Sequence, residues 1–282
     1  MPILPEEKHF PNGYLGNLTE QQLRSLEELK ERLLLESEVN PCAKAAIDHG
    51  WGDILLLKIL RATMSSAAKK SGGKRTFRVE PAFKRILDIM QWRNTYSVHE
   101  RPATIEKYHE VYPYVEWKDR KAGTVVRVER LGLLFNNVKR SHFTTDEWLH
   151  NLGYNTNCTD IKLREIYEET GKDIPGYIVL ADWKGGGLGI LSRIGMLKMF
   201  NSIAADNFPE TLDKVYIFNV PVFISKLVNL GKSFVDPVTM SKMEFIPGTP
   251  KELFRELFEI EKLPKEYGGE SEEVLGIPMD AR

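Results

Sequence analysis

The chemistry most readily available to this sequence is the binding of an anionic group by the segment from Asp236 to Lys242. Within it Asp236, Thr239, Ser241 and Lys242 supply a carboxylate, two hydroxyls and an ammonium group close to a helix break. Hydroxyl and ammonium donors near a helix start suit a phosphate. A capped helix start, with Pro237 at the first helical position, explains the same residues without a ligand. The residues alone leave both interpretations open.

Patterns typical of catalysis or metal binding are missing from the sequence. The histidines lack ligand spacing, Cys42 and Cys158 have no histidine at ligand spacing, and no Gly-x-Ser-x-Gly elbow is present. We therefore expect no catalytic residue and no metal ion. The glycine-rich run from Lys184 to Gly189 could cradle phosphate, but it fits neither a dinucleotide fingerprint nor a Walker lysine. A tight turn capped by Asp182 is the favoured interpretation, with nucleotide-dependent chemistry as the enzymatic alternative.

The composition is that of a soluble, folded protein. The 39 Lys and Arg residues and 40 Asp and Glu residues give a formal net charge of -1, which does not favour nucleic acid. Hydrophobic residues make up 42% and charged residues 28% of the chain, as in ordinary globular proteins. The sequence shows no secretory signal and no run approaching the ~20 apolar residues of a membrane-spanning helix. With no disulfide framework either, we expect a cytoplasmic protein.

The first third of the sequence predicts helices. Thr19 to Gln22 has the form of a capping box, and leucines at three- and four-residue spacing follow from Leu23 to Leu33, with Leu34 as a further candidate. Asn40-Pro41 ends this helix. The elements predicted next are a helix from Trp51 to Met64, a polar loop over residues 65–74 and a helix from Glu80 to Trp92.

The remainder predicts strands alternating with helices, the pattern of an α/β fold with a parallel sheet and a crossover helix. The predicted strands are Thr124–Val128, Tyr177–Ala181 and Lys214–Asn219. The predicted helices run from about Thr145 to Thr170, then over Ile190–Ala205, Pro221–Val235 and Pro250–Phe258, and an irregular tail begins at Leu263–Gly269. The helix over Pro221–Val235 is distinctive because its apolar residues cover more than a narrow stripe.

Short segments spread over about residues 14–270 carry a family signature. They are GYLGNLTEQQLRSLEELKERL, LLLKILRA and QWRNTY in the helical part, then GTVVRVERLG, IVLADWKG, NFPETLDKVYIFNVP, FVDPVTMSKM and LPKEYGG. Together, in this order and at these separations, they resemble the CRAL-TRIO lipid-binding proteins, and among them the yeast-type secretory phosphatidylinositol transfer proteins.

The resemblance implies a helical N-terminal part at residues 1–96, a lipid-binding domain at 97–270 and a C-terminal tail at 271–282. In that domain a mixed β-sheet floor and helical walls would enclose an apolar cavity for one lipid, lined in part by Tyr177 and Val179. A gate helix over residues 223–236 would close the cavity. The apolar residues of this gate are Phe223, Ile224, Leu227 and Val228.

The resemblance also implies how the headgroup of phosphatidylinositol would be held. Glu210 and Thr239 would hydrogen-bond inositol hydroxyls, and Lys242 would counter the phosphodiester charge, with Asp236 in the same segment. The bound phospholipid, or another hydrophobic ligand, would take the place of any cofactor.

Some positions depart from the family. Thr63 stands where the family has an arginine that supports the phosphoinositide site. Trp183 and Ala181 stand where one branch has the tyrosine and histidine of a haem site, so no haem is expected. The positions aligned with the family's choline site hold Tyr177, Val179, Val115, Glu116 and Arg127, and phosphatidylcholine exchange is therefore not implied.

Taken together, these observations predict a non-enzymatic phosphatidylinositol transfer protein. We expect a monomer that exchanges one lipid between membranes, contacts the membrane surface transiently and peripherally, and presents the lipid to a lipid kinase. Two alternatives stay open. One is a carrier of another hydrophobic ligand of the sterol, tocopherol or retinoid type, and the other is a lipid-sensing interaction module without transfer activity.

Overall fold

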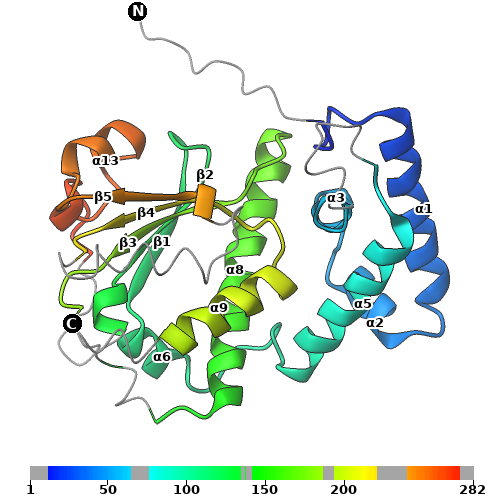
Figure 1. The fold of residues 1–282 in the computed structure, drawn as a ribbon, viewed down its shortest axis with the longest axis horizontal. Coiled ribbons are helices and arrows are strands. Elements are labelled where there is room, and N and C mark those ends of the chain that lie inside the picture. The colour runs from blue at the N-terminus through cyan, green and yellow to red at the C-terminus, as the bar shows by residue number, and fades with distance from the viewer. Residues whose placement is uncertain are drawn as a thin grey trace, which may run out of the picture. The chain divides into compact units, whose positions relative to one another are not determined.

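The structure is a computed structural model of the 282-residue chain that describes residues 12–64, 76–134, 137, 142–186, 194–220 and 240–273. The chain divides into two compact units, Met1–Thr95 and Tyr96–Arg282. The described part of the first unit is helical, and the second holds a five-stranded sheet with helices against it (Figure 1). The predicted loop over 65–74 and the predicted helix over 221–235 lie outside the described residues.

Local capping determines where the early helices of the first unit begin. Its helices are α1 (Glu20–Glu36), α2 (Pro41–Asp48), α3 (Asp53–Ala62) and α5 (Val79–Thr95). The predicted capping box is confirmed, because the N–H of Gln22 donates to the Thr19 hydroxyl at 3.2 Å and the N–H of Thr19 donates to Gln22 Oε1 at 2.9 Å. Asn40-Pro41, predicted only to end a helix, also starts α2. Asn40 Oδ1 accepts from the N–H of Cys42 at 2.9 Å, and proline suits the first helical position.

One face of α1 contributes to the core of the first unit. Leu26, Leu29 and Leu33 are buried with residues of α3 and α5. Leu23 and Leu34 are 50% and 64% exposed, so their predicted place in the same stripe is wrong. At about 3.6 residues per turn, Gln22 rather than Leu23 continues the buried face toward the helix start, and its side chain is indeed buried.

The second unit is built on a mixed sheet whose strands follow one another in chain order. They are β1 (Tyr114–Asp119), β2 (Thr124–Glu129), β3 (Tyr177–Asp182), β4 (Leu212–Phe218) and β5 (Met243–Ile246). β1 pairs antiparallel with β2, and the later neighbours pair in parallel. The mixed α/β class is confirmed. β1 was not predicted because Glu116, Lys118 and Asp119 interrupt its apolar residues, and β5 was not predicted because it has only 4 residues.

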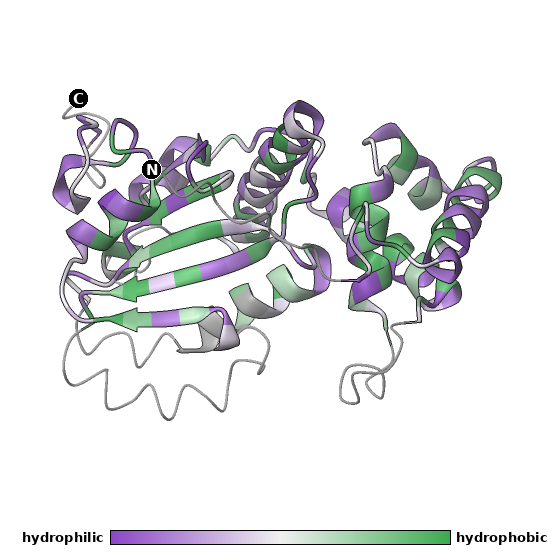
Figure 2. Cartoon of the chain, turned by 90° about the horizontal axis from the view of Figure 1, so that it is seen from above, coloured by the Kyte–Doolittle hydropathy of each residue, from purple (hydrophilic) through white to green (hydrophobic). Residues whose placement is uncertain are grey.

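Helices lie on both sides of this sheet (Figure 1). They are α6 (Ile105–Val111), α8 (Thr145–Thr170), α9 (Ile194–Asn207), α13 (Lys251–Leu257) and a 3-10 helix, η2 (Lys265–Tyr267). The predicted helices near 145–170, 190–205 and 250–258 correspond to α8, α9 and α13, whereas α6 was not predicted. Figure 2 shows strands dominated by hydrophobic residues and interrupted by hydrophilic ones.

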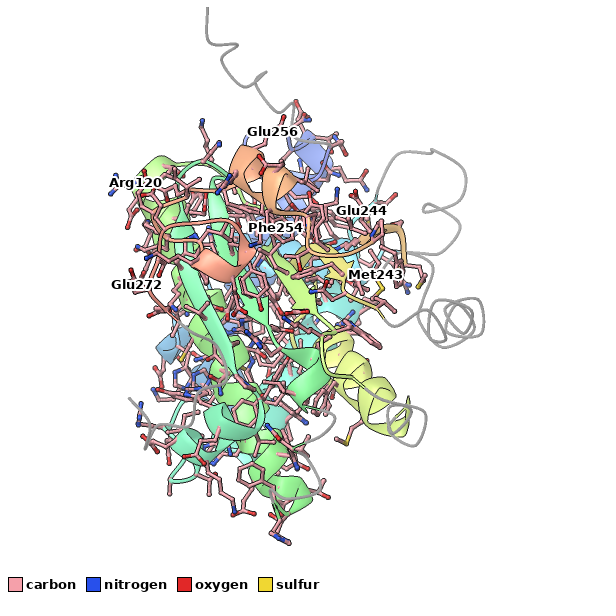
Figure 3. All side chains as sticks on the ribbon, turned by 90° about the vertical axis from the view of Figure 1, so that its left-hand side faces the viewer. Arg120, Met243, Glu244, Phe254, Glu256 and Glu272 are labelled. Atoms are coloured by element: carbon pink, nitrogen blue, oxygen red, sulfur yellow. The ribbon has the colours of Figure 1, made fainter. Side chains whose placement is uncertain are left out.

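One face of the sheet is covered by the segment that runs from α13 through η2. Phe254 of α13, labelled in Figure 3, is fully buried there. Leu263 and Tyr267 are 0% and 1% exposed, so the segment predicted to begin an irregular tail is packed against the sheet, and η2 is a short helical turn within it. This segment is packed, and Arg255 Nε donates to the carbonyl oxygen of Gly268 at 2.6 Å. The face and its cover comprise Val126, Val128, Leu180, Tyr216, Phe218, Phe254, Phe258, Leu263 and Tyr267.

The opposite face of the sheet changes character from strand to strand. Over β3 and β4 it is apolar, because Val179 lies beside Val215 and Ala181 beside Ile217 in the register. Over β1 and β2 it carries charged and tyrosine side chains in addition to Val125, on which α8 packs. The face that is free of the C-terminal cover therefore has an apolar part and a polar part.

The assignment of the buried face of α1 can be tested by making the same Leu→Ala substitution at a buried and at an exposed position of this helix. Leu29 is fully buried and Leu35 is 73% exposed, and both lie in α1. We expect Leu29→Ala to reduce the free energy of unfolding by about 2–5 kcal/mol because it leaves a cavity. Leu35→Ala should change it by less than about 0.5 kcal/mol. Urea denaturation followed by circular dichroism measures both, and equal losses would contradict the assignment of the buried face.

Candidate functional site

The first part of the candidate site lies where β4 and β5 begin. Lys242 directly precedes β5, and its Nζ donates to the carbonyl oxygen of Leu212, the first residue of β4. Glu210 lies just before the same strand. The structure thus places two of the predicted headgroup residues, Glu210 and Lys242, at one edge of the sheet. The other two, Asp236 and Thr239, lie outside the described residues.

Glu210 has an unusual backbone conformation. Its φ is 52°, in the left-handed region that residues with a Cβ atom seldom adopt. Thr211, the residue after Glu210, closes this turn, because its hydroxyl donates to the carbonyl oxygen of Phe208 at 3.0 Å. A glutamate here is therefore held against its own conformational preference by the turn around it.

The second part of the candidate site is the apolar part of the sheet face opposite the C-terminal cover. Val179, Ala181, Val215 and Ile217 form one buried cluster, with Tyr177 among the partly buried residues against it. Tyr177 and Val179 are the predicted cavity-lining residues, and both lie on this face. Their contact with a ligand remains a prediction, and the predicted gate residues lie outside the described residues. These are Phe223, Ile224, Leu227 and Val228.

The third part is a buried charged cluster on the same face, over β1 and β2. Arg127 Nε donates to Glu116 Oε2 at 2.7 Å, and its Nη2 lies 2.6 Å from the same oxygen and also donates to the Thr159 hydroxyl. Arg127 Nη1 lies 3.6 Å from Glu129 Oε1. Lys162 Nζ reaches the second oxygen of Glu116 at 2.7 Å. Two carboxylates therefore face one buried guanidinium, with a partly exposed ammonium group at the margin.

Tyrosine side chains surround this cluster. The Arg127 guanidinium carbon lies 4.5 Å from the centre of the Tyr114 ring and 5.3 Å from that of Tyr177. The Tyr112 hydroxyl donates to Glu129 Oε2 at 2.6 Å. Because aromatic faces attract cations, the two rings add to the attraction of the carboxylates for the guanidinium.

The two carboxylates of the cluster have opposite pKa shifts. Burial opposes ionisation of Glu116, but attraction to Arg127 and Lys162 and hydrogen bonds from Lys162 and Thr159 outweigh it and lower its pKa. Burial raises the pKa of Glu129, and Arg127 and the Tyr112 hydroxyl offset this only in part. Burial also raises the pKa of Tyr177 to about 12 in spite of Arg127. Arg127 therefore forms its main ion pair with Glu116, at 2.6 Å, and only a longer contact with Glu129, at 3.6 Å.

The sequence alone predicts no function for this cluster, in which Glu116 and Arg127 are only departures from a family pattern. A signal was present, because Arg127 and Glu129 are two positions apart on one strand. Since side chains alternate along a strand, Arg127 and Glu129 had to share a face. The missing knowledge was that Glu116 stands directly opposite Arg127 in the register.

A family match lies within the second unit. Residues 135–269, a little under half of the chain, match the CRAL/TRIO domain family. A SEC14 cytosolic factor of Yarrowia lipolytica is 27% identical over 95% of this chain and 52% of its own length. Those of Schizosaccharomyces pombe and Kluyveromyces lactis are 24% and 29% identical, over 92% and 93% of this chain and 86% and 82% of their own lengths.

A solved structure shares the fold. The crystal structure of Sfh5 superposes with a TM-score of 0.59 at 18% sequence identity, and the match covers 89% of each chain. The resemblance inferred from the sequence segments is therefore confirmed, and the chain is related to SEC14 cytosolic factors over most of its length.

Asp182, at the end of β3 and within the residues that match this family, connects separate parts of the chain. Its Oδ1 accepts from the N–H of Lys184 at 2.9 Å and from Asn219 Nδ2 at 2.8 Å, and its Oδ2 accepts from the Tyr267 hydroxyl at 2.9 Å. The expected turn-capping role is thus present. Gly185 in that turn has a φ of 84°, which suits the favoured interpretation of a tight turn, and Gly187 to Gly189 lie outside the described residues.

Thr63, which replaces a family arginine, makes local contacts in the first unit. Its hydroxyl donates to the carbonyl oxygens of Ile59 at 2.9 Å and Leu60 at 3.3 Å within its own helix. Among the described residues no group of three or more His, Cys, Asp or Glu side chains could hold a metal ion. Within that same part of the chain, no helix is both long enough and apolar enough to cross a membrane.

The opposite pKa shifts give the two carboxylates opposite effects on stability as the pH changes. Glu129 has a raised folded-state pKa, so the parent loses stability as the pH rises from about 4.3, the ordinary glutamate pKa, through that raised value. We expect the melting temperature of Glu129→Gln, relative to the parent, to increase over that interval because glutamine does not ionise.

Glu116→Gln is the matched control for this measurement. Its folded-state pKa is lowered, so the parent gains stability from ionised Glu116 as the pH rises to about 4.3 and keeps it above that value. The melting temperature of Glu116→Gln relative to the parent should therefore fall up to that pH and then stay level. The same trend in both variants would contradict the assignment of the two carboxylates.

Proposed function

We propose that this chain binds one phosphatidylinositol molecule against the sheet face opposite the C-terminal cover and transfers it between membranes. The observation that carries the proposal is the adjacency of an apolar surface, around Val179 and Val215, to a sheet edge that bears Glu210 and Lys242. The CRAL/TRIO match and the relationship to SEC14 cytosolic factors support it. A further relative, 24% identical over 69% of this chain, is named phosphatidylinositol/phosphatidylcholine transfer protein SFH12 of Arabidopsis thaliana.

The apolar part of this surface suits acyl chains. Moving a lipid out of a bilayer requires a protein surface that shields its methylene groups from water. Burial of each methylene group contributes about 0.8 kcal/mol. Val179, Ala181, Val215 and Ile217 offer no polar side-chain atom to such a chain. The proposed gate over residues 223–236 would complete the enclosure and contact the membrane surface transiently during exchange.

The edge at β4 and β5 suits the headgroup. An ammonium group at Lys242 can counter the charge of a phosphodiester, and the carboxylate of Glu210 can accept hydrogen bonds from inositol hydroxyls. The strained φ of Glu210 supports this role, because strained residues cluster at ligand sites. Asp236 and Thr239 would add to the same headgroup site from the segment that leads to Lys242. Presentation of the bound lipid to a lipid kinase, by a monomeric cytoplasmic protein, is part of this proposal.

Transfer of labelled phosphatidylinositol between vesicles tests the proposal. The parent should transfer the lipid, and Lys242→Ala should reduce the rate at least about tenfold, because a charge-assisted hydrogen bond contributes about 1.5–3 kcal/mol. Glu210→Gly should reduce it similarly while the melting temperature stays level or rises, since glycine relieves the left-handed backbone. A lower transfer rate with an unchanged or higher melting temperature would show that the variant has lost a ligand contact and not its fold.

The matched control removes the same charges elsewhere. Lys44 and Asp48 form an exposed pair in α2, and Lys44→Ala/Asp48→Ala should transfer as the parent does. The parent could instead transfer no phosphatidylinositol, and the lipid extract of the purified protein could contain another apolar molecule. That molecule, and not phosphatidylinositol, would then be the ligand. Binding of phosphatidylinositol without exchange would indicate a lipid-sensing module.

A further inference from the structure

The first unit exposes apolar side chains where α1 ends and α2 begins. Leu34 and Leu35 at the end of α1 are 64% and 73% exposed, and Val39 in the following turn is 81% exposed. Most of the large hydrophobic residues that are exposed in the described part of the chain lie in α1, this turn and α2. A single exposed leucine is ordinary, whereas a group of exposed apolar residues marks an interaction site. We call Leu34, Leu35 and Val39 the α1–α2 apolar patch.

The backbone that carries the patch is ordered by hydrogen bonds. The N–H groups of Val39 and Asn40 both donate to the carbonyl oxygen of Glu36, at 3.1 and 2.8 Å. The Ser37 hydroxyl donates to the carbonyl oxygen of Leu34 at 2.7 Å, and Asn40 caps α2 with its side chain. Because the turn is already ordered, a partner that binds it does not have to fix its backbone, which favours binding.

An open hollow of about 430 Å³ adjoins the patch. Val39 forms part of its wall. The rest of the wall comes from the start of α2 and from one side of α5, namely Asn40, Pro41, Cys42, Leu87, Asp88 and Gln91. Protein interfaces are commonly anchored by a side chain that fills a pocket in the partner. The hollow is therefore a place for an apolar anchor, with a carboxylate at its margin.

Acidic residues without ion-pair partners accompany the patch. Seven acidic and four basic residues lie between Glu20 and Asp48. Each of the four basic residues already has an acidic partner. By contrast, Glu31, Glu36 and Glu38 form no ion pair within the described part of the chain. Glu31 lies one helical turn before the two leucines, and the other two lie between Leu35 and Val39 in sequence. The surroundings of the patch thus carry uncompensated negative charge.

This charge determines which class of partner fits the patch. An anionic membrane surface attracts basic segments and would be repelled by these glutamates. A second copy of the chain would place the same glutamates against one another, because an isologous interface pairs a patch with its own copy. A protein helix with apolar residues on one side and lysine or arginine beside them matches both the patch and its charge.

We propose that the α1–α2 apolar patch is the docking surface for a basic, amphipathic helix of another protein. One apolar side chain of that helix fills the hollow beside Val39, and others cover Leu34 and Leu35. Its basic side chains lie opposite the three glutamates. The proposal is independent of lipid binding, because the residues proposed to hold the lipid all belong to the second unit.

Selection of peptides from a phage-displayed random library on the full chain tests the proposal. We expect the enriched peptides to carry net positive charge and apolar residues at three- and four-residue spacing. Binding of such a peptide, measured by fluorescence anisotropy, should weaken at least about tenfold in Leu35→Gln/Val39→Gln, because glutamine removes the apolar surface that the peptide buries. Glu36→Lys/Glu38→Lys should weaken it at least about threefold by reversing two charges.

Folding and specificity are controlled separately. The substituted side chains are exposed, so the melting temperatures should stay close to that of the parent. Ile161→Gln is the matched control, because Ile161 is an exposed isoleucine of the second unit, and it should bind the peptide as the parent does. The proposal would be overturned if no enriched peptide distinguished the parent from Leu35→Gln/Val39→Gln.

The other occupants have their own readouts. A dimer of the parent in sedimentation that is lost in Leu35→Gln/Val39→Gln would assign the patch to a second copy of the chain. Co-sedimentation with vesicles of phosphatidylcholine and phosphatidylserine that is lost in the same variant would assign it to a membrane. Either result would overturn the proposal, and neither depends on whether the chain transfers phosphatidylinositol.

Discussion

A single buried carboxylate, Asp182, holds the C-terminal ends of the central strands and the cover of the sheet in one arrangement. It is 1% exposed and accepts hydrogen bonds from the turn after β3, from Asn219 after β4 and from Tyr267 in η2. A buried charge without such donors would be strongly unfavourable, so all three segments must be in place together. Asn219 also exchanges hydrogen bonds with Thr249, which brings the chain after β5 into the same arrangement.

This arrangement gives the two faces of the sheet different roles. Tyr267 and Leu263 are held against one face. There the rings of Tyr267, Phe254 and Phe258 pack edge-to-face on those of Tyr216 and Phe218. Since the chain itself buries that face, the opposite face is the one on which we propose that the ligand binds. The apolar part around Val179 and the polar part around Arg127 both belong to this opposite face.

Local signals in the sequence predicted the elements well, and long-range contacts explain what was not predicted. The capping box at Thr19 needs only a partner three residues away, and it is present as expected. By contrast, Asp182 finds partners 37 and 85 residues away, and the burial of Leu263 and Tyr267 depends on strands far earlier in the chain. β1 is polar in sequence because its charged residues are satisfied only when Glu116 meets Arg127 across the sheet and Lys118 meets Glu169 in α8. The resemblance supplied Glu210 and Lys242, whose common edge follows from the parallel pairing of β4 and β5.

The distribution of charge on this face bears on the proposed lipid site. At the β4–β5 edge, Lys242 is only partly buried and can reach water or a headgroup, so its charge can act on a ligand. At the other end, the charge of Arg127 is met by Glu116 and by two tyrosine rings and is closed to water. Of these two cations, Lys242 is therefore the one whose charge is available to the anionic headgroup of the proposed lipid.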